Sequence, residues 1–179
     1  MMRAVGLVLV VGLLVSGMSI TLAPAGSSSE TNAYAVAVIE HRYCSDARSL
    51  LGAPQRGWCG SSAGSYADIQ ANGYVIVEVG CAFNLSPDND LRVYEVPGND
   101  GFVVSVSADL CEWVGMTEIP SATRGIRRPY CKPIAVDCGT SEVVFRYVKI
   151  EGIQVPGSVG SVPGCEIAAI EALHPRESE

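Results

Sequence analysis

The sequence predicts an all-β protein, a disulfide-stapled β-sandwich, from three observations. Runs of six to eight residues rich in Val, Ile and Tyr recur along the chain, and most are bounded by Gly, Pro, Asn or Asp. Only residues 47–51 and the last run have a helix-like composition. The 179-residue chain also holds seven cysteines behind an N-terminal export signal, and exported domains commonly form disulfides. Several short strands separated by turns are typical of a β-sandwich.

Residues 1–25 have the pattern of a secretory signal. Arg3 supplies the positive charge, residues 5–15 form the apolar stretch, and Ala23 and Ala25 complete an A-x-A pattern that places cleavage after Ala25. An uncleaved signal anchor is the alternative. We expect an extracellular or cell-surface protein with no membrane span after cleavage. The expected organisation is a polar tether at 26–33, the β-sandwich domain at 34–174 and a polar tail at 175–179.

Six strands are predicted at 34–39, 74–79, 91–96, 102–107, 143–150 and 167–173. In the third, Leu91, Val93 and Glu95 share one face, because side chains alternate along a strand. Residues 97–101 (PGNDG) then turn the chain. The last run, IAAIEAL, could be helical by propensity. We expect a strand there, because it is short and its neighbours are strands.

The cysteines all follow the signal, at Cys44, Cys59, Cys81, Cys111, Cys131, Cys138 and Cys165. An odd number leaves at least one thiol unpaired or bonded to another chain. Cys44–Cys59 and Cys131–Cys138 are the predicted local bridges, because each closes a short loop flanked by turn residues. Bridges among Cys81, Cys111 and Cys165 stay open. Zinc is disfavoured, because the sequence has no C-x-x-C pair.

The charge balance argues against binding nucleic acid. The chain has 19 acidic residues against 12 basic ones, for a net charge of −7, whereas phosphate binding needs clustered Lys and Arg. Catalytic motifs get little support from the sequence. Residues 60–64 (GSSAG) fit the letters of G-x-S-x-G, but no predicted strand and helix flank them as a nucleophile elbow requires, and no H-E-x-x-H is present. The composition therefore favours a binding or assembly protein, and a hydrolase ranks last.

Four segments, in order, resemble a family of secreted prokaryotic cell-surface domains with a galactose-binding-like jelly-roll sandwich. Residues 51–54 resemble L-G-A-P-D, with Gln55 in place of Asp. Residues 90–95 resemble D-[LF]-x-V-[FY]-E. Residues 102–109, with Trp113 and Gly115, resemble F-x-V-x-V-S-x-D-G…W…G, with Leu110 where glycine is usual. Residues 146–150 and 164–172 resemble R-Y-V-[RK]-I…G-x-D-[LI]-D-A-[VI]-E-A.

The resemblance implies two kinds of site. Sugar-binding jelly rolls present exposed aromatic rings, which here would be Trp58, Tyr66 and Tyr74; packing of a loop aromatic over a disulfide is the alternative. Related jelly rolls often hold a structural calcium ion. Asp88, Asp90 and Glu95 form the most oxygen-rich cluster, and Glu166 stands at a ligand position of the closing motif, whereas Ala168 has replaced the second. A solvated turn is the alternative for Asp88 and Asp90.

Two functions follow as expectations. The first is a non-catalytic module of the cell surface that adheres to a glycan or surface polymer. The second is a structural subunit of an extracellular filament or assembly, whose partner would be other copies of itself. The odd cysteine and the N-terminal tether favour the second, because an extended segment can add a strand to a neighbour's sheet.

Overall fold

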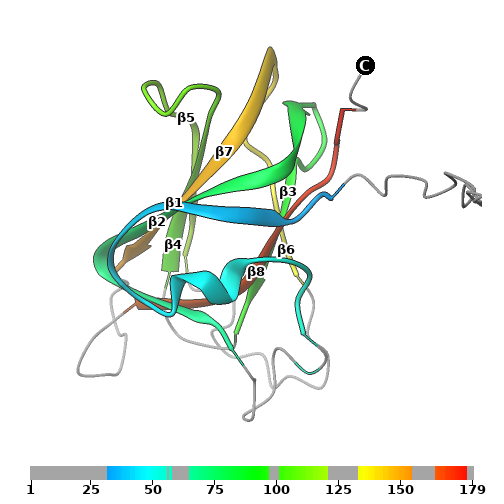
Figure 1. Cartoon of the computed structure of the whole chain (residues 1–179). Helices are drawn as coiled ribbons and strands as arrows, with labels where there is room; N and C mark the ends of the chain where they lie inside the picture. The colour runs from blue at the N-terminus through cyan, green and yellow to red at the C-terminus, as the bar shows by residue number, and fades with distance from the viewer. Residues whose placement is uncertain are drawn as a thin grey trace, which may run out of the picture.

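The computed structural model describes residues 32–55, 57, 65–96, 101–120, 133–154 and 164–176. These residues form eight antiparallel strands and one short 3₁₀ helix (Figure 1). The elements are β1 (Ala35–Ser45), η1 (Ala47–Leu50), β2 (Ala67–Leu85), β3 (Leu91–Glu95), β4 (Gly101–Ser107), β5 (Val114–Ile119), β6 (Ile134–Val136), β7 (Ser141–Ile153) and β8 (Gly164–Ala172). The expected export signal at 1–25 lies outside the described residues.

All six predicted strands are confirmed, and so is the short helical turn after the first. The last run, which could have been helical, is β8. Two strands were not predicted. β5 contains Gly115 at φ 65°, and β6 has only three residues, so neither shows an alternation long enough to recognise. Within the described residues, no helix has the length and hydrophobicity needed to cross a bilayer.

The strands fold into two layers that share β2. The sheet order is β5-β4-β7-β2-β8-β3-β6, and β1 pairs with β2 along its other edge. Residues Ala67 to Gln70 of β2 pair with β8, whereas its later part pairs with β7. Between these parts the register shifts, and Asn72 adopts φ 64°. A strand that bends in this way passes from one sheet to the other, which confirms a β-sandwich with a five-stranded layer (β5-β4-β7-β2-β1) and a three-stranded layer (β8-β3-β6).

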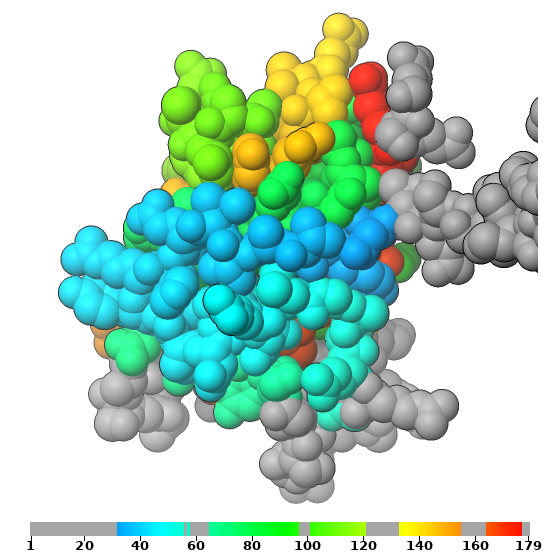
Figure 2. Space-filling view, in the orientation of Figure 1, coloured from blue at the N-terminus to red at the C-terminus, as the bar shows by residue number. Residues whose placement is uncertain are grey.

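The core fills the space between the layers. Phe102 and Ile150 of the larger layer and Leu91 and Ile170 of the smaller one have no exposed surface, and β8 lies against β4 and β7. In the space-filling view, β1 and the segment that follows it cover the front of the molecule, with β5 rising above them (Figure 2). Burial of apolar surface between the layers is the main stabilising contribution.

The predicted alternation in β3 is confirmed. Leu91, Val93 and Glu95 are buried, whereas Arg92 between them is exposed. Arg92 and Arg146 are cations on or near the strands around Glu95. Each forms an ion pair elsewhere, Arg92 with Glu171 and Arg146 with Glu78, both at 3.4 Å.

The predicted disulfide staple is wrong for the described part of the chain. Cys44, Cys81, Cys111 and Cys138 are free thiols, so neither Cys44–Cys59 nor Cys131–Cys138 forms. Cys59 and Cys131 themselves lie outside the described residues. Cys81, Cys138 and Cys165 belong to the hydrophobic core, and Cys44 packs against it. Loop length alone misled the prediction, because a small thiol also serves as an ordinary core side chain.

Candidate functional site

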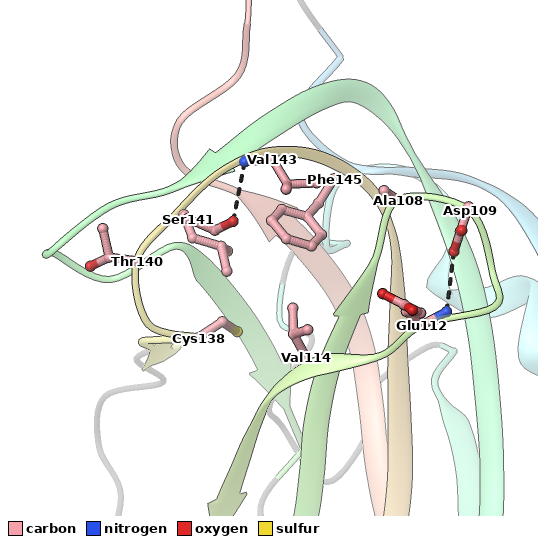
Figure 3. A pocket seen from close by; sticks show the side chains of 10 residues that line it. Ala108, Asp109, Glu112, Val114, Cys138, Thr140, Ser141, Val143 and Phe145 are labelled. Atoms are coloured by element: carbon pink, nitrogen blue, oxygen red, sulfur yellow. Dashed lines mark hydrogen bonds between the residues drawn. The ribbon is translucent and has the colours of Figure 1, made fainter.

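A pocket of about 370 Å³ opens at one end of the sandwich, where β2 and β4 finish and β5 and β7 begin. We call it the end pocket; it is lined by side chains from the end of β2, from the β4–β5 turn and from the segment that leads into β7 (Figure 3). Its volume lies in the range typical of small-molecule sites. Because antiparallel strands bring alternate loops to the same end, three distant segments meet here.

The floor of the end pocket is apolar and belongs to the core. Leu85 and Phe145 line it and are 5% and 4% exposed. The Phe145 ring packs against Phe83, with ring centroids 6.2 Å apart. Val114 and Val143 form apolar parts of the rim, 42% and 53% exposed. A ligand therefore meets a rigid aromatic and aliphatic surface at the bottom of the pocket.

The β4–β5 turn forms one wall and is held together by its own side chains. Ser107 Oγ accepts a hydrogen bond from the backbone N–H of Leu110 at 2.9 Å. One carboxylate oxygen of Asp109, Oδ1, accepts bonds from the backbone N–H groups of Cys111 at 2.8 Å and Glu112 at 3.2 Å. Serine and aspartate favour such turns because their side chains bond the backbone two or three residues ahead.

This arrangement fixes a negative charge at the pocket. The hydrogen bond from the Cys111 backbone, then that from Glu112, holds the pKa of Asp109 below its usual value. Among the described residues, the second oxygen, Oδ2, accepts no hydrogen bond. In Figure 3 the Glu112 carboxylate points into the pocket, beside Val114. Both carboxylates are thus placed to accept hydrogen bonds from a ligand.

The opposite wall is the segment before β7, and Asp90 supports it from beneath. Asp90 is fully buried. Its Oδ2 accepts a hydrogen bond from the Cys138 backbone at 2.7 Å, and its Oδ1 accepts one from the Ser86 backbone at 2.8 Å. Asp90 therefore ties the β2–β3 loop to the pocket wall. Thr140 and Ser141, also in the lining, add two hydroxyl groups to the rim.

The predicted aromatic site is not part of the end pocket. Trp58 lies outside the described residues. Tyr66 is 36% exposed and precedes β2, so it lies near the end of the sandwich opposite the pocket. Tyr74 lies within β2, and its hydroxyl donates a hydrogen bond to Glu40. Sugar contact by these three side chains stays a prediction.

The four predicted calcium ligands do not come together as one site. Asp90 directly precedes β3 and Glu95 is its last residue, so the two are about 16 Å apart along an extended strand. Glu166 lies at the Glu95 end, where its carbonyl accepts a hydrogen bond from the Val96 backbone. Asp88 is exposed, and both oxygens of Asp90 already bind backbone N–H groups. Among the described residues, no group of three or more His, Cys, Asp or Glu side chains is placed to hold a metal ion.

Sequence reasoning missed most of the end pocket, including Glu112, Thr140 and Ser141. A usable signal was present in Ser107 and Asp109, which stand two residues apart at the end of a predicted strand and so indicate a structured turn. Trp113, the next motif residue, lies on the sheet instead, where the Lys149 ammonium is 5.0 Å from its ring centroid.

No family model matches the sequence, and no curated protein matches it. Among solved structures, the chain is similar to a pectin binding carbohydrate binding module, with 11% sequence identity and a TM-score of 0.43 over 76% of this chain and 91% of that one. It is similar to the CBM32 of AlyQ in complex with 4,5-unsaturated mannuronic acid, with 15% identity and a TM-score of 0.43 over 78% of this chain and 98% of that one. A third is truncated AlyQ with CBM32 and alginate lyase domains, with 15% identity and a TM-score of 0.46 over 80% of this chain and 32% of that one.

Proposed function

We propose that the protein is a non-catalytic carbohydrate-binding module that holds a saccharide in the end pocket. The observation that carries this proposal is the combination of an apolar floor with a rim of oxygen acceptors. A sugar ring has an apolar C–H face and a set of hydroxyl groups. Phe145 and Leu85 offer a surface for the first, while Asp109 and Glu112 accept hydrogen bonds from the second, and bonds to charged acceptors are the stronger kind.

The protonation properties of the pocket argue against a general acid and a thiolate nucleophile in it. Asp109 has a pKa below its usual value, so it is a poor proton donor near neutral pH. Burial, together with the nearby charges of Asp90 and Asp137, raises the pKa of Cys138 to about 12, which disfavours a thiolate nucleophile. The two histidines are not in the described lining of the pocket: His41 lies in β1, and His174 Nε2 is 3.0 Å from the Asn89 carbonyl.

The proposal includes an extracellular location at a prokaryotic cell surface, with a glycan or surface polymer as partner. The export signal and the four motif resemblances support this part. The division into a larger and a smaller antiparallel layer is consistent with the galactose-binding-like jelly-roll type.

A binding screen tests the proposal. A glycan array that includes pectin and mannuronate oligosaccharides would select ligands, and titration calorimetry would give affinities. Val143→Trp places a large ring at the rim, on a side chain that is already half exposed, and we expect at least about a tenfold loss of affinity. Val36→Trp, at a similarly exposed site on β1, is the matched control.

Variants of the predicted aromatic residues show whether the saccharide binds in the end pocket or at the aromatic site. If the end pocket binds the saccharide, Tyr66→Ala and Trp58→Ala keep wild-type affinity. If these two variants abolish binding and Val143→Trp does not, the aromatic site is correct and the end pocket is not.

Self-assembly is the second candidate, and one observation favours it. β5 is an edge strand, and its Met116 side chain is 72% exposed. Edge strands with exposed apolar side chains can pair with another copy. Sedimentation velocity over a range of concentrations, with Met116→Lys as the variant, would detect such assembly and would attribute it to β5.

A further inference from the structure

The end pocket carries an excess of negative charge that a simple polyol site does not need. Two carboxylates, Asp109 and Glu112, stand in its lining, and the lining contains no Lys, Arg or His among the described residues. Asp90 and Asp137 lie directly behind the wall, where each accepts a hydrogen bond from the backbone of the 138–139 segment, at 2.7 Å in both cases. The described lining of the pocket therefore carries charges of one sign, all negative.

Among the described residues, the two cations of β7 have partners outside the pocket lining. Lys149 pairs with Glu151 at 3.0 Å, and its ammonium lies over the Trp113 ring. Arg146, next to Phe145 in sequence, pairs with Glu78 on the neighbouring strand. Both side chains belong to β7 and lie outside the pocket lining, and neither forms an ion pair with Asp109 or Glu112.

The negative charge is also built in rather than adjustable. Asp109 is locked by the hydrogen bonds of the β4–β5 turn, which favour its ionised form. Asp109 and Glu112 are both exposed at the rim, so a charged ligand can reach both carboxylates, and salt screens the interaction. A ligand with its own carboxylate would be repelled here, whereas a ligand with an ammonium group would form charge-assisted hydrogen bonds.

From this geometry we propose that the end pocket selects saccharides that carry a protonated amino group and rejects uronic acids. The inference rests on the proposed function and names the ligand class of the same site. Glu112 is the main specificity residue, because its carboxylate points into the cavity and takes no part in holding the turn by its side chain (Figure 3). Asp109 contributes its charge and positions the turn.

Three trisaccharides of matched size test the inference: a β-1,4-linked glucosamine oligomer, its N-acetylated form and a galacturonic acid oligomer. Calorimetry at about pH 6 keeps the amines protonated and the uronates ionised. We expect the glucosamine oligomer to bind at least about tenfold more tightly than the N-acetylated form, and the uronate to bind most weakly. High salt should reduce the difference, because salt screens exposed charges.

Variants assign the selectivity to the pocket. Glu112→Gln should reduce the preference for the amino sugar to about threefold or less, and Glu112→Lys should invert the order in favour of the uronate. Glu118→Gln, which removes an exposed carboxylate from β5 outside the lining, should leave the order unchanged.

The outcomes separate the two proposals. Equal or weaker binding of the amino sugar, or an order that Glu112→Gln does not change, overturns the selectivity while carbohydrate binding stands. If neither these three oligomers nor any glycan on the array binds, the proposed function fails and the selectivity fails with it.

Discussion

Asp90 was predicted as a calcium ligand, whereas the structure gives it a different task that can be measured. The side chain is fully buried, and its two oxygens accept hydrogen bonds from the Ser86 and Cys138 backbones. Asp90→Ala would remove both acceptors and leave two backbone donors without partners. Hydrogen bonds to charged groups contribute about 1.5–3 kcal/mol each, so the expected loss is about 3–6 kcal/mol of the free energy of unfolding.

The assay is chemical denaturation followed by tryptophan fluorescence and circular dichroism. Asp90→Asn keeps one acceptor oxygen and should lose about half as much, about 1.5–3 kcal/mol, so it supplies a value if the alanine variant does not fold. Asp88→Ala, at an exposed position two residues earlier, should change stability by less than about 0.5 kcal/mol.

Repeating the measurement with calcium and with a chelator separates the two roles of Asp90. If Asp90 binds only backbone N–H groups, its mutation lowers the free energy of unfolding by the same amount in both buffers. A loss that appears only with calcium present would refute the reasoning and restore the calcium ligand. A loss below about 1 kcal/mol in both buffers would refute the hydrogen-bond account as well.

Three further predictions concern the segments around the end pocket. Leu110 adopts φ 70°, so Leu110→Gly should stabilise the protein by about 0.5–1 kcal/mol, because a left-handed residue costs about 1–2 kcal/mol and glycine's freedom in the unfolded chain offsets part of the gain; a thermal melt that shows destabilisation would contradict this. A Cβ at Gly115 would lie 2.5 Å from the Cys138 carbonyl oxygen, whereas one at Gly52 would meet nothing within 4 Å. Gly115→Ala should therefore lose about 2–4 kcal/mol and Gly52→Ala about 1 kcal/mol in denaturant titrations, and equal losses would argue against close packing. Burial raises the pKa of the Cys138 thiol from 9.0 to about 12, so its neutral form stabilises the fold below pH 9, and this contribution disappears as pH rises from about 9 to about 12; Cys138→Ala should flatten the loss of stability over that range, and an unchanged slope would contradict the assignment.

Strand positions were predictable because the buried side chains of a strand alternate with exposed ones, and this alternation is visible in the sequence. Leu91, Val93 and Glu95 alternate with Arg92 and Tyr94, and the structure buries the first set. β2 was predicted over only six residues, although it extends over nineteen. Its first part does alternate, with Ala67 and Ile69 beside Asp68 and Gln70, but its apolar side chains are mostly small, and Asn72-Gly73 has the composition of a turn, at the place where the strand bends and changes partner between the two layers.

The functional site was less predictable, because no local pattern records how loops meet. Asp109 and Thr140 are 31 positions apart in the sequence, and they share a pocket only because β4 ends where β7 begins. The predicted calcium ligands are dispersed for the same reason. Asp90 and Glu95 are neighbours in sequence, but an extended strand separates them by about 16 Å. Sequence proximity favours a shared site in a turn and opposes it along a strand.

In the end pocket, core residues form the floor and turn residues form the rim, so the residues that shape the site differ from those that select the ligand. Phe145 and Leu85 shape the floor and are constrained by packing, so changes there alter the fold. Glu112 stands on an exposed turn whose hydrogen bonds come from Ser107 and Asp109. Its side chain can therefore change without disturbing the turn that presents it. If the floor provides general affinity for sugar rings and Glu112 provides the selection by charge, Glu112→Gln should change the ranking of ligands far more than it changes the stability of the fold.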